Sequence, residues 1–314
     1  MKNIFPFLSK YNSIHTILFL TFMILLLFYF INLSILPSID TFENENASKP
    51  ELPKKIFTYW NEVEITNPLV KKNIEMIQKI LPADFTFTIF NEKTILDELG
   101  EDIKYKYHDM STDTNFSDFI RYYLIYKYGG TWMDSTYFIL DFQKAILDKY
   151  KMYEQNPFDA GYYEFSGRSI GNKINEKYYE SWFMIAPPKN KYIGKVLEEF
   201  KQGATIGFKK YKEDLKKQNI NLKNLIEGDG DYYLMIYAMV RKVLTQNPNY
   251  KIQTFDLNHV LFNYWNEDLF QKLLNPKELK QYEAIKLTGS HRSLITKHNK
   301  EKEFLDTLDK FYTS

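Results

Sequence analysis

The stretch from Ser111 to Leu140 restricts the possible fold more than any other part of the chain. Its first half carries apolar and aromatic residues at helical spacing. The pair Gly129 and Gly130 ends this helix, because glycine adopts the left-handed backbone of a helix terminus without a clash at Cβ. The apolar residues that follow predict a strand, and Asp134 stands where this strand ends or bulges. A helix, a glycine turn and a strand in this order hold one carboxylate rigidly at the edge of a sheet.

Two charged residues lie on one face of the predicted helix. Asp118 and Arg121 are three positions apart, which brings their side chains together, and Ser117 or Asp118 is placed to cap the helix start. One interpretation is an intrahelical ion pair, which contributes only about 0.3–0.5 kcal/mol when exposed. The glycine turn and Asp134 favour the other interpretation, in which the pair belongs to a functional site.

The same stretch resembles a known family. The segment DFIRYYLIYKYGGTWMDST is similar to the core of the DXD sugar-transferase superfamily, and within it to the branch that is like capsular polysaccharide synthesis proteins. The superfamily motif is often Asp-X-Asp. Here Asp134 is followed by Ser135 and Thr136, so the second carboxylate is missing. The positions that match the family pattern are Asp118, Arg121, Gly129, Gly130 and Asp134.

The resemblance implies a GT-A-type, Rossmann-like α/β fold that binds a nucleotide-sugar. It also implies retaining transfer of a hexose to a glycan, polysaccharide or glycolipid acceptor. A divalent ion such as Mn²⁺ or Mg²⁺ would neutralise the departing diphosphate, and such ions prefer oxygen ligands. Asp134 is then the expected metal ligand, with Thr136 or water in place of the missing acid. Asp118 is expected to bind hydroxyls of the donor sugar, and Arg121 to hold Asp118 and place positive charge nearby.

The resemblance assigns a place in or near the functional site to five more positions, one of them the already named Gly130. Most of them also have an ordinary structural interpretation. Trp60 either lies near the nucleotide base or covers a core. Trp182 either lines the acceptor side or packs within a strand. Asp231 either borders the active site or only caps a late helix. His291 either approaches the metal or diphosphate or is structural, and Gly130 is placed among the donor-binding residues.

Strands and helices alternate along the chain. Strands are predicted over residues 55–60 and 85–90, and between them a helix begins at Pro68 with Asn67 as its cap. This alternation favours parallel pairing and an α/β sheet. Ligands of such sheets bind at the carboxyl ends of strands. Trp60 and Asp134 are both expected at such ends. Further strands are predicted over residues 160–165, 181–186 and 284–288.

Residues 16–36 contain no charged side chain. About 20 apolar residues span a bilayer as a helix. A cleaved signal peptide is the alternative, but its apolar region typically has only about 7–15 residues. We therefore expect an uncleaved signal anchor in a single-pass membrane protein. The few flanking lysines indicate its orientation only weakly. In a eukaryote the globular part would face a Golgi-type lumen. In a bacterium it would lie at the inner membrane and meet its donor in the cytosol.

The predicted organisation is an N-terminal tail over residues 1–15, the anchor over 16–36, a linker over 37–53 and a glycosyltransferase domain over 54–314. The 314 residues carry a formal net charge of +1, which gives no indication of a nucleic-acid partner. The expected partners are instead the nucleotide-sugar, the acceptor and the lipid bilayer. The chain contains no cysteine, so it forms no disulfide.

Two other functions remain open on the sequence. The missing second acid of the motif is compatible with a glycan-binding module of the same fold that has lost catalysis. A glycoside hydrolase is the other alternative, although nothing in the sequence fixes two carboxylates at a separation of about 5–9 Å.

Overall fold

The computed structural model describes residues 50–106, 113–165, 178–222, 225, 232–262 and 268–313. These residues belong to one compact unit that begins at Pro50. The predicted membrane anchor over residues 16–36 lies outside the described residues. Within them, none of the helices has the length and apolar character needed to cross a bilayer.

Six strands of the described chain form the main sheet, in the order β2–β1–β3–β6–β5–β7. β1 runs parallel to β2 and β3, β5 runs parallel to β7, and β6 is antiparallel to both of its neighbours. The predicted α/β class is confirmed, with a mixed sheet. Its strands are β1 (Lys55–Tyr59), β2 (Thr86–Phe90), β3 (Gly130–Met133), β5 (Ala160–Phe165), β6 (Tyr178–Ala186) and β7 (Ile252–Asp256).

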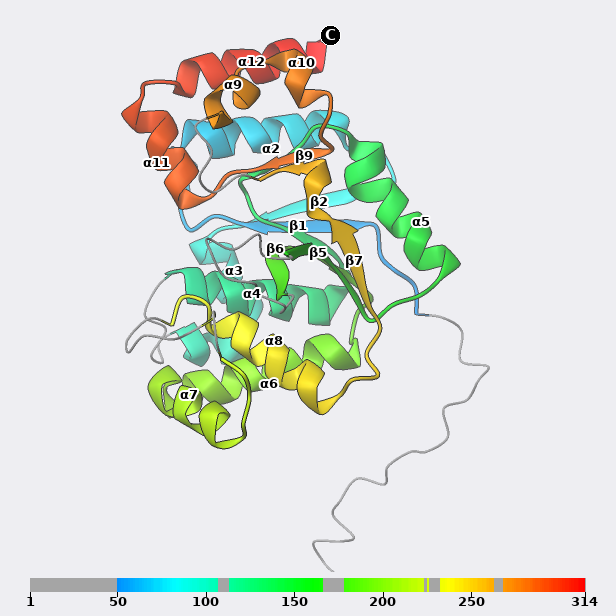
Figure 1. The fold of residues 1–314 in the computed structure, drawn as a ribbon, viewed down its shortest axis with the longest axis vertical. Helices are drawn as coiled ribbons and strands as arrows, with labels where there is room; N and C mark the ends of the chain where they lie inside the picture. The colour runs from blue at the N-terminus through cyan, green and yellow to red at the C-terminus, as the bar shows by residue number, and fades with distance from the viewer. Residues whose placement is uncertain are drawn as a thin grey trace, which may run out of the picture. The chain divides into compact units, whose positions relative to one another are not determined.

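Helices cover both faces of this sheet (Figure 1). One face packs against α4 (Asp113–Tyr128), α6 (Lys191–Ile206) and α8 (Met235–Gln246), and their apolar side chains form one core with Phe57 and Trp132. The other face carries a second core with α5 (Asp148–Gln155) and one end of α2 (Pro68–Ile80). The remaining segments around these layers are α3 (Glu92–Leu99), η1 (Gly100–Lys106), η2 (Gln143–Leu147) and α7 (Phe208–Lys217).

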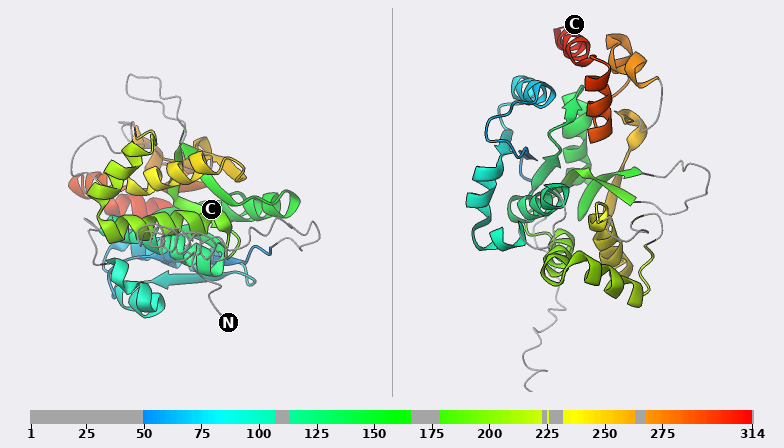
Figure 2. Two further views of the ribbon diagram at one scale, coloured as in Figure 1. Left: turned by 90° about the horizontal axis from the view of Figure 1, so that it is seen from below. Right: turned by 90° about the vertical axis from the view of Figure 1, so that its left-hand side faces the viewer.

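A small second sheet lies beside the main one and has the order β4–β9–β8. β4 (Tyr137–Ile139) pairs antiparallel with β9 (Ala284–Lys286), and β9 pairs parallel with β8 (Val260–Leu261). A third core joins this sheet to α2 and to the C-terminal helices, which lie together in Figures 1 and 2. These segments are η3 (Leu257–His259), α9 (Leu269–Leu273), α10 (Pro276–Leu279), α11 (Gly289–Lys297) and α12 (Glu301–Thr313).

Local sequence explains where several elements begin. Asn67 caps α2 as predicted, since its side chain accepts hydrogen bonds from the backbone N–H groups of Leu69 and Val70. The predicted cap of α4 is wrong, because this helix begins at Asp113 and therefore contains Ser117 and Asp118 in its interior. The extra turn is stabilised by the buried residues Asn115 and Phe116.

The glycine pair ends α4 as predicted. Gly129 and Gly130 have φ values of 64° and 100°, a region that disfavours every other residue. Both also lie against backbone. A Cβ on Gly129 would meet the nitrogen of Pro188 at 2.5 Å, and one on Gly130 would meet the carbonyl oxygen of Lys55 at 2.4 Å. Gly130 therefore lets β3 approach β1 closely enough to pair with it, and Gly129 leaves room for the backbone at Pro188.

Replacement of Gly130 by alanine is predicted to lower the free energy of unfolding by at least about 3 kcal/mol, because backbone strain and a backbone clash act together. Gly100→Ala is the matched control, since Gly100 also has a positive φ of 54° but no atom lies within 4 Å of its added Cβ. The control should lose only about 1–2 kcal/mol. Urea unfolding of both variants measures the difference, and equal losses would contradict the role assigned to the close contact.

Candidate functional site

A cavity of about 710 Å³ lies at the carboxyl ends of β1 and β3. Its walls come from these strand ends and from α4, β6, α8, β9 and α11. Cavities of this size hold small-molecule ligands and cofactors, and the ends of parallel strands are where α/β folds bind them. The residues predicted for function that line this cavity are Trp60, Asp118, Arg121, Asp134, Thr136 and Trp182.

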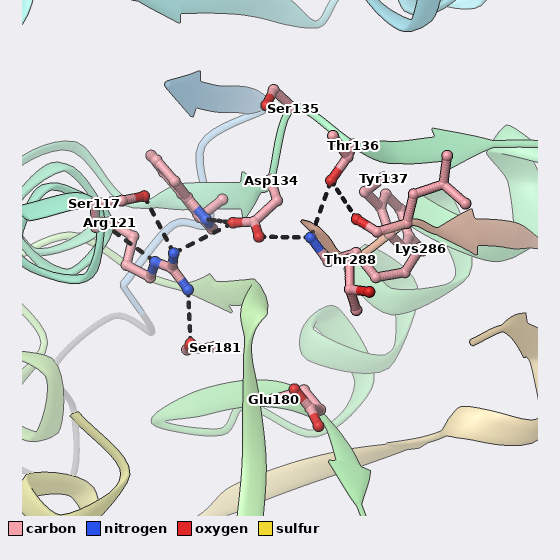
Figure 3. A network of polar contacts seen from close by, with 12 residues as sticks. Ser117, Arg121, Asp134, Ser135, Thr136, Tyr137, Glu180, Ser181, Lys286 and Thr288 are labelled. Carbon is pink, nitrogen blue, oxygen red and sulfur yellow. Dashed lines mark hydrogen bonds and ion pairs between the residues drawn. The ribbon is translucent and has the colours of Figure 1, made fainter. Parts of the chain in front are cut away.

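Arg121 joins three elements around the cavity (Figure 3). Its Nη1 lies 3.2 Å from Asp118 Oδ1 and donates to Ser181 Oγ of β6 at 2.6 Å. Its Nη2 lies 3.4 Å from Asp134 Oδ1 and donates to Ser117 Oγ at 3.2 Å. Only 6% of the Arg121 side chain is exposed. The predicted neighbours Asp118 and Arg121 are therefore not an exposed helix pair, and the same guanidinium also contacts Asp134.

Asp134 is held from both sides. Its Oδ2 accepts a hydrogen bond from Lys286 Nζ at 2.6 Å, and its Oδ1 accepts one from Trp132 Nε1 at 3.1 Å while facing Arg121. Lys286 Nζ also donates to Thr136 Oγ1 at 3.1 Å. The antiparallel pairing of β4 with β9 produces this arrangement, because it brings the end of β9 next to the residues that follow β3.

The surroundings of Asp134 and Asp118 shift the pKa values of these two carboxyl groups in opposite directions. Burial alone would raise the pKa of Asp134, but Lys286 and Arg121 beside it lower the pKa below its ordinary value of 3.8. Burial raises the pKa of Asp118 to about 7, against the opposing effect of the Arg121 guanidinium. Burial lowers the pKa of Lys286, and the Asp134 carboxylate opposes that change. Asp134 is thus the ionised carboxylate of the pair at neutral pH.

Glu180 also lines the cavity and, like Asp118, is a buried carboxyl group. It precedes Ser181 on β6, and its Oε2 accepts a hydrogen bond from the hydroxyl of Tyr237 on α8 at 3.2 Å. Burial raises its pKa to about 7, and the Tyr237 hydrogen bond opposes the rise. A carboxyl group with this pKa exchanges its proton near neutral pH, which is typical of groups in active sites.

Aromatic rings form two parts of the wall. The guanidinium of Arg292, in the first turns of α11, lies 5.7 Å from the ring centroid of Trp60. Trp182 is 4% exposed and stacks on Tyr163 and Tyr137, with ring centroids 5.0 and 5.5 Å away. Trp182 therefore combines both alternatives, because it packs within the core and also lines the cavity.

Two predicted site residues do not line the cavity. Gly130 begins β3 and lies against Lys55, at the opposite end of the strand from Asp134, so it shapes the backbone and is not placed to contact a donor. His291 caps α11: its Nδ1 accepts the backbone N–H of Thr288, and Thr288 Oγ1 accepts the backbone N–H of His291. The predicted Asp231 lies outside the described residues.

The predicted metal ligands do not fit a divalent ion in this arrangement. Both oxygens of Asp134 face cations, and Thr136 Oγ1 donates to the carbonyl of Leu287 at 2.7 Å while it accepts from Lys286. His291 points into the cap of its own helix. Across the described ranges, no three or more His, Asp or Glu side chains are grouped so that they could hold a metal.

Three of the lining residues were not identified from the sequence. Lys286 is the single charge within the run Ala284–Leu287, and Glu180 is the single acid in the strand that ends in SWFMIA. A charge inside an apolar strand was the available indication for both. Arg292 was also missed, and its position beside Trp60 depends on how α11 packs.

Comparison with known proteins agrees with the early resemblance. Residues 26–286 match the family described as capsular polysaccharide synthesis protein. The chain belongs to this family. The match covers the core segment around Asp118, Arg121 and Asp134, and every described residue of the cavity wall except those of α11 and the residues just before it.

Other comparisons are weaker. No curated protein sequence matches the chain significantly. Among solved structures, the chain is similar to one named PaToxG Glycosyltransferase, at 12% identity and a TM-score of 0.37 over 63% of this chain and 70% of that one.

Replacement of Glu180 by glutamine is predicted to stabilise the fold at high pH. The folded-state pKa of about 7 exceeds the ordinary value of 4.5, so the stability contributed by protonated Glu180 is complete below about pH 4.5 and is lost as pH rises through 7. Glutamine avoids this loss. The variant should gain about 3 kcal/mol over the natural chain at pH 8 and almost nothing at pH 4.

Thermal unfolding followed by circular dichroism between pH 4 and 8 measures this effect. Glu154→Gln is the control, since Glu154 is exposed. A difference between Glu180→Gln and the natural chain that stays constant with pH would show that Glu180 is not a buried group titrating near neutrality.

Proposed function

We propose that the protein is a glycosyltransferase that moves a sugar, most simply a hexose, from a nucleoside-diphosphate donor to a glycan acceptor. Membership of the capsular polysaccharide synthesis family supports this, because a polysaccharide is built by repeated sugar transfer. The observation that carries the proposal is the network of Asp118, Arg121 and Asp134 inside a single cavity at the ends of parallel strands.

The wall of the cavity suits the parts of such a donor. Trp60 offers an aromatic face for a nucleotide base at one side. The cations Arg121, Lys286 and Arg292 suit a diphosphate. Asp118 is buried next to Arg121 and offers carboxyl oxygens to sugar hydroxyls. A GT-A-type mode of donor binding is the arrangement that these placements favour.

The proposed reaction breaks the bond between the anomeric carbon and the diphosphate oxygen and forms a bond from that carbon to an acceptor oxygen. The acceptor proton passes to the departing phosphate. The cationic side chains that line the cavity stabilise the negative charge that develops on the leaving group. We propose retention of the anomeric configuration on the basis of the family resemblance, and NMR of the product would show an inverted anomer if this is incorrect.

We further propose that residues 16–36 anchor the protein in a membrane, on the single ground that this run contains no charge and is long enough to span a bilayer. The side of the membrane depends on the organism. The acceptor, a polysaccharide or glycolipid, would then be met at the bilayer surface.

Replacement of Asp118 by asparagine is predicted to lower sugar transfer at least about 100-fold, because a misplaced donor loses the alignment that the reaction needs. The full-length protein in mild detergent is incubated with a panel of nucleotide-sugars, and released nucleotide is quantified. Glu154→Gln is the control, because Glu154 is exposed and does not line the cavity.

Two outcomes would contradict this function. Cleavage of a glycoside in the absence of any nucleotide would favour a hydrolase. Retention of glycan without binding or turnover of any nucleotide-sugar would favour a glycan-binding module that has lost catalysis.

A further inference from the structure

Lys286 occupies the position next to Asp134 that a metal ion would otherwise need. Its Nζ is 2.6 Å from Asp134 Oδ2 and 3.1 Å from Thr136 Oγ1. Asp134 and Thr136 are two of the three residues that the sequence predicted as metal ligands. Its side chain is 7% exposed and lines the cavity. The ammonium group is thus a cation held by the same oxygens and directed at the same space.

A divalent ion at this position would face strong repulsion. Like charges a few ångströms apart repel one another, and the double charge of a divalent ion doubles the repulsion from each side-chain cation. Lys286 and Arg121 both contact Asp134, at 2.6 and 3.4 Å. One carboxylate shared by two side-chain cations is a poor ligand for a third cation.

We propose that Lys286, held by Asp134 and Thr136, supplies the positive charge for the donor's diphosphate, and that donor binding needs no divalent metal. This inference rests on the proposed function. Asp134 then serves as a positioning residue that holds the Lys286 ammonium group in place. This role also explains why the second acid of the Asp-X-Asp motif is missing, because a lysine needs no second carboxylate.

The cavity offers further support for an anion beside Lys286. Arg292 lines it from α11, and the N-terminal residues Thr288 and Gly289 of that helix line it too. Helix N-termini favour negative charge, and lysine is a common phosphate-binding residue as a compact point charge. Two of the acids in the wall, Asp118 and Glu180, have pKa values raised to about 7 by burial, which weakens their repulsion of a phosphate.

The test measures nucleoside-diphosphate binding directly. The full-length protein is titrated with UDP, GDP, CDP and ADP by calorimetry, once with excess EDTA and once with Mn²⁺ or Mg²⁺. The dissociation constant for the preferred nucleotide should agree within about threefold between these conditions. Binding that appears only with the metal would overturn the inference and leave the glycosyltransferase function standing, whereas no binding under any condition would overturn both.

Variants of Lys286 provide the second part of the test. Lys286→Met removes the charge at similar length and should weaken binding at least about tenfold in EDTA, while Lys286→Arg should retain most of it. Lys242→Met is the matched control, because Lys242 is also 7% exposed and pairs with Glu199 at 2.7 Å outside the cavity wall. Equal binding by Lys286→Met and the natural chain would contradict the proposal, and so would Mn²⁺ dependence of the natural chain.

Discussion

The pairing of Asp134 with two cations determines the arrangement of this site. Lys286 comes from the small sheet, Arg121 from the helix that covers the main sheet, and Asp134 from the end of the central strand β3. Their contacts connect both sheets and α4 at one point. Burying such charges costs free energy. Their mutual pairing, the hydrogen bond that Trp132 donates to Asp134 and the one that Arg121 donates to Ser181 offset much of that cost. The cavity is therefore shaped by a charge network that packing alone would not produce.

This network divides the carboxyl groups of the cavity into two kinds. Asp134 is paired with cations and has a lowered pKa, whereas burial raises the pKa values of Asp118 and Glu180 to about 7. A carboxyl group with a pKa of about 7 is partly protonated at physiological pH. It can therefore donate a hydrogen bond to a sugar hydroxyl group or accept one from it. The stability lost by burying them is a common feature of active sites. The three cations Arg121, Lys286 and Arg292 line the same cavity and favour a negatively charged ligand.

Local features of the fold were predictable because they depend on neighbouring residues. Asn67 with Pro68 fixed the start of α2, and the glycine pair fixed the end of α4 and the position of Asp134. Trp60 and Asp134 were correctly expected at the carboxyl ends of strands, and the parallel pairing of β1 with β3 brings those two ends together. The start of α4 was wrong, because burial of Asn115 and Phe116 extends the helix by a turn. Lys286 and Glu180 depend on the pairing of β4 with β9 and of β3 with β6, which no local spacing encodes.

A crystal structure of the protein with a nucleotide-sugar or its nucleoside diphosphate bound would test the central claim most directly. We expect the diphosphate within hydrogen-bonding distance of Lys286 and Arg292, the sugar against Asp118, and the base on the side of Trp60. Lys286 should remain on Asp134. A donor bound outside this cavity would contradict the assigned site, and a divalent ion between Asp134 and the diphosphate, with Lys286 displaced, would contradict the role assigned to its ammonium group.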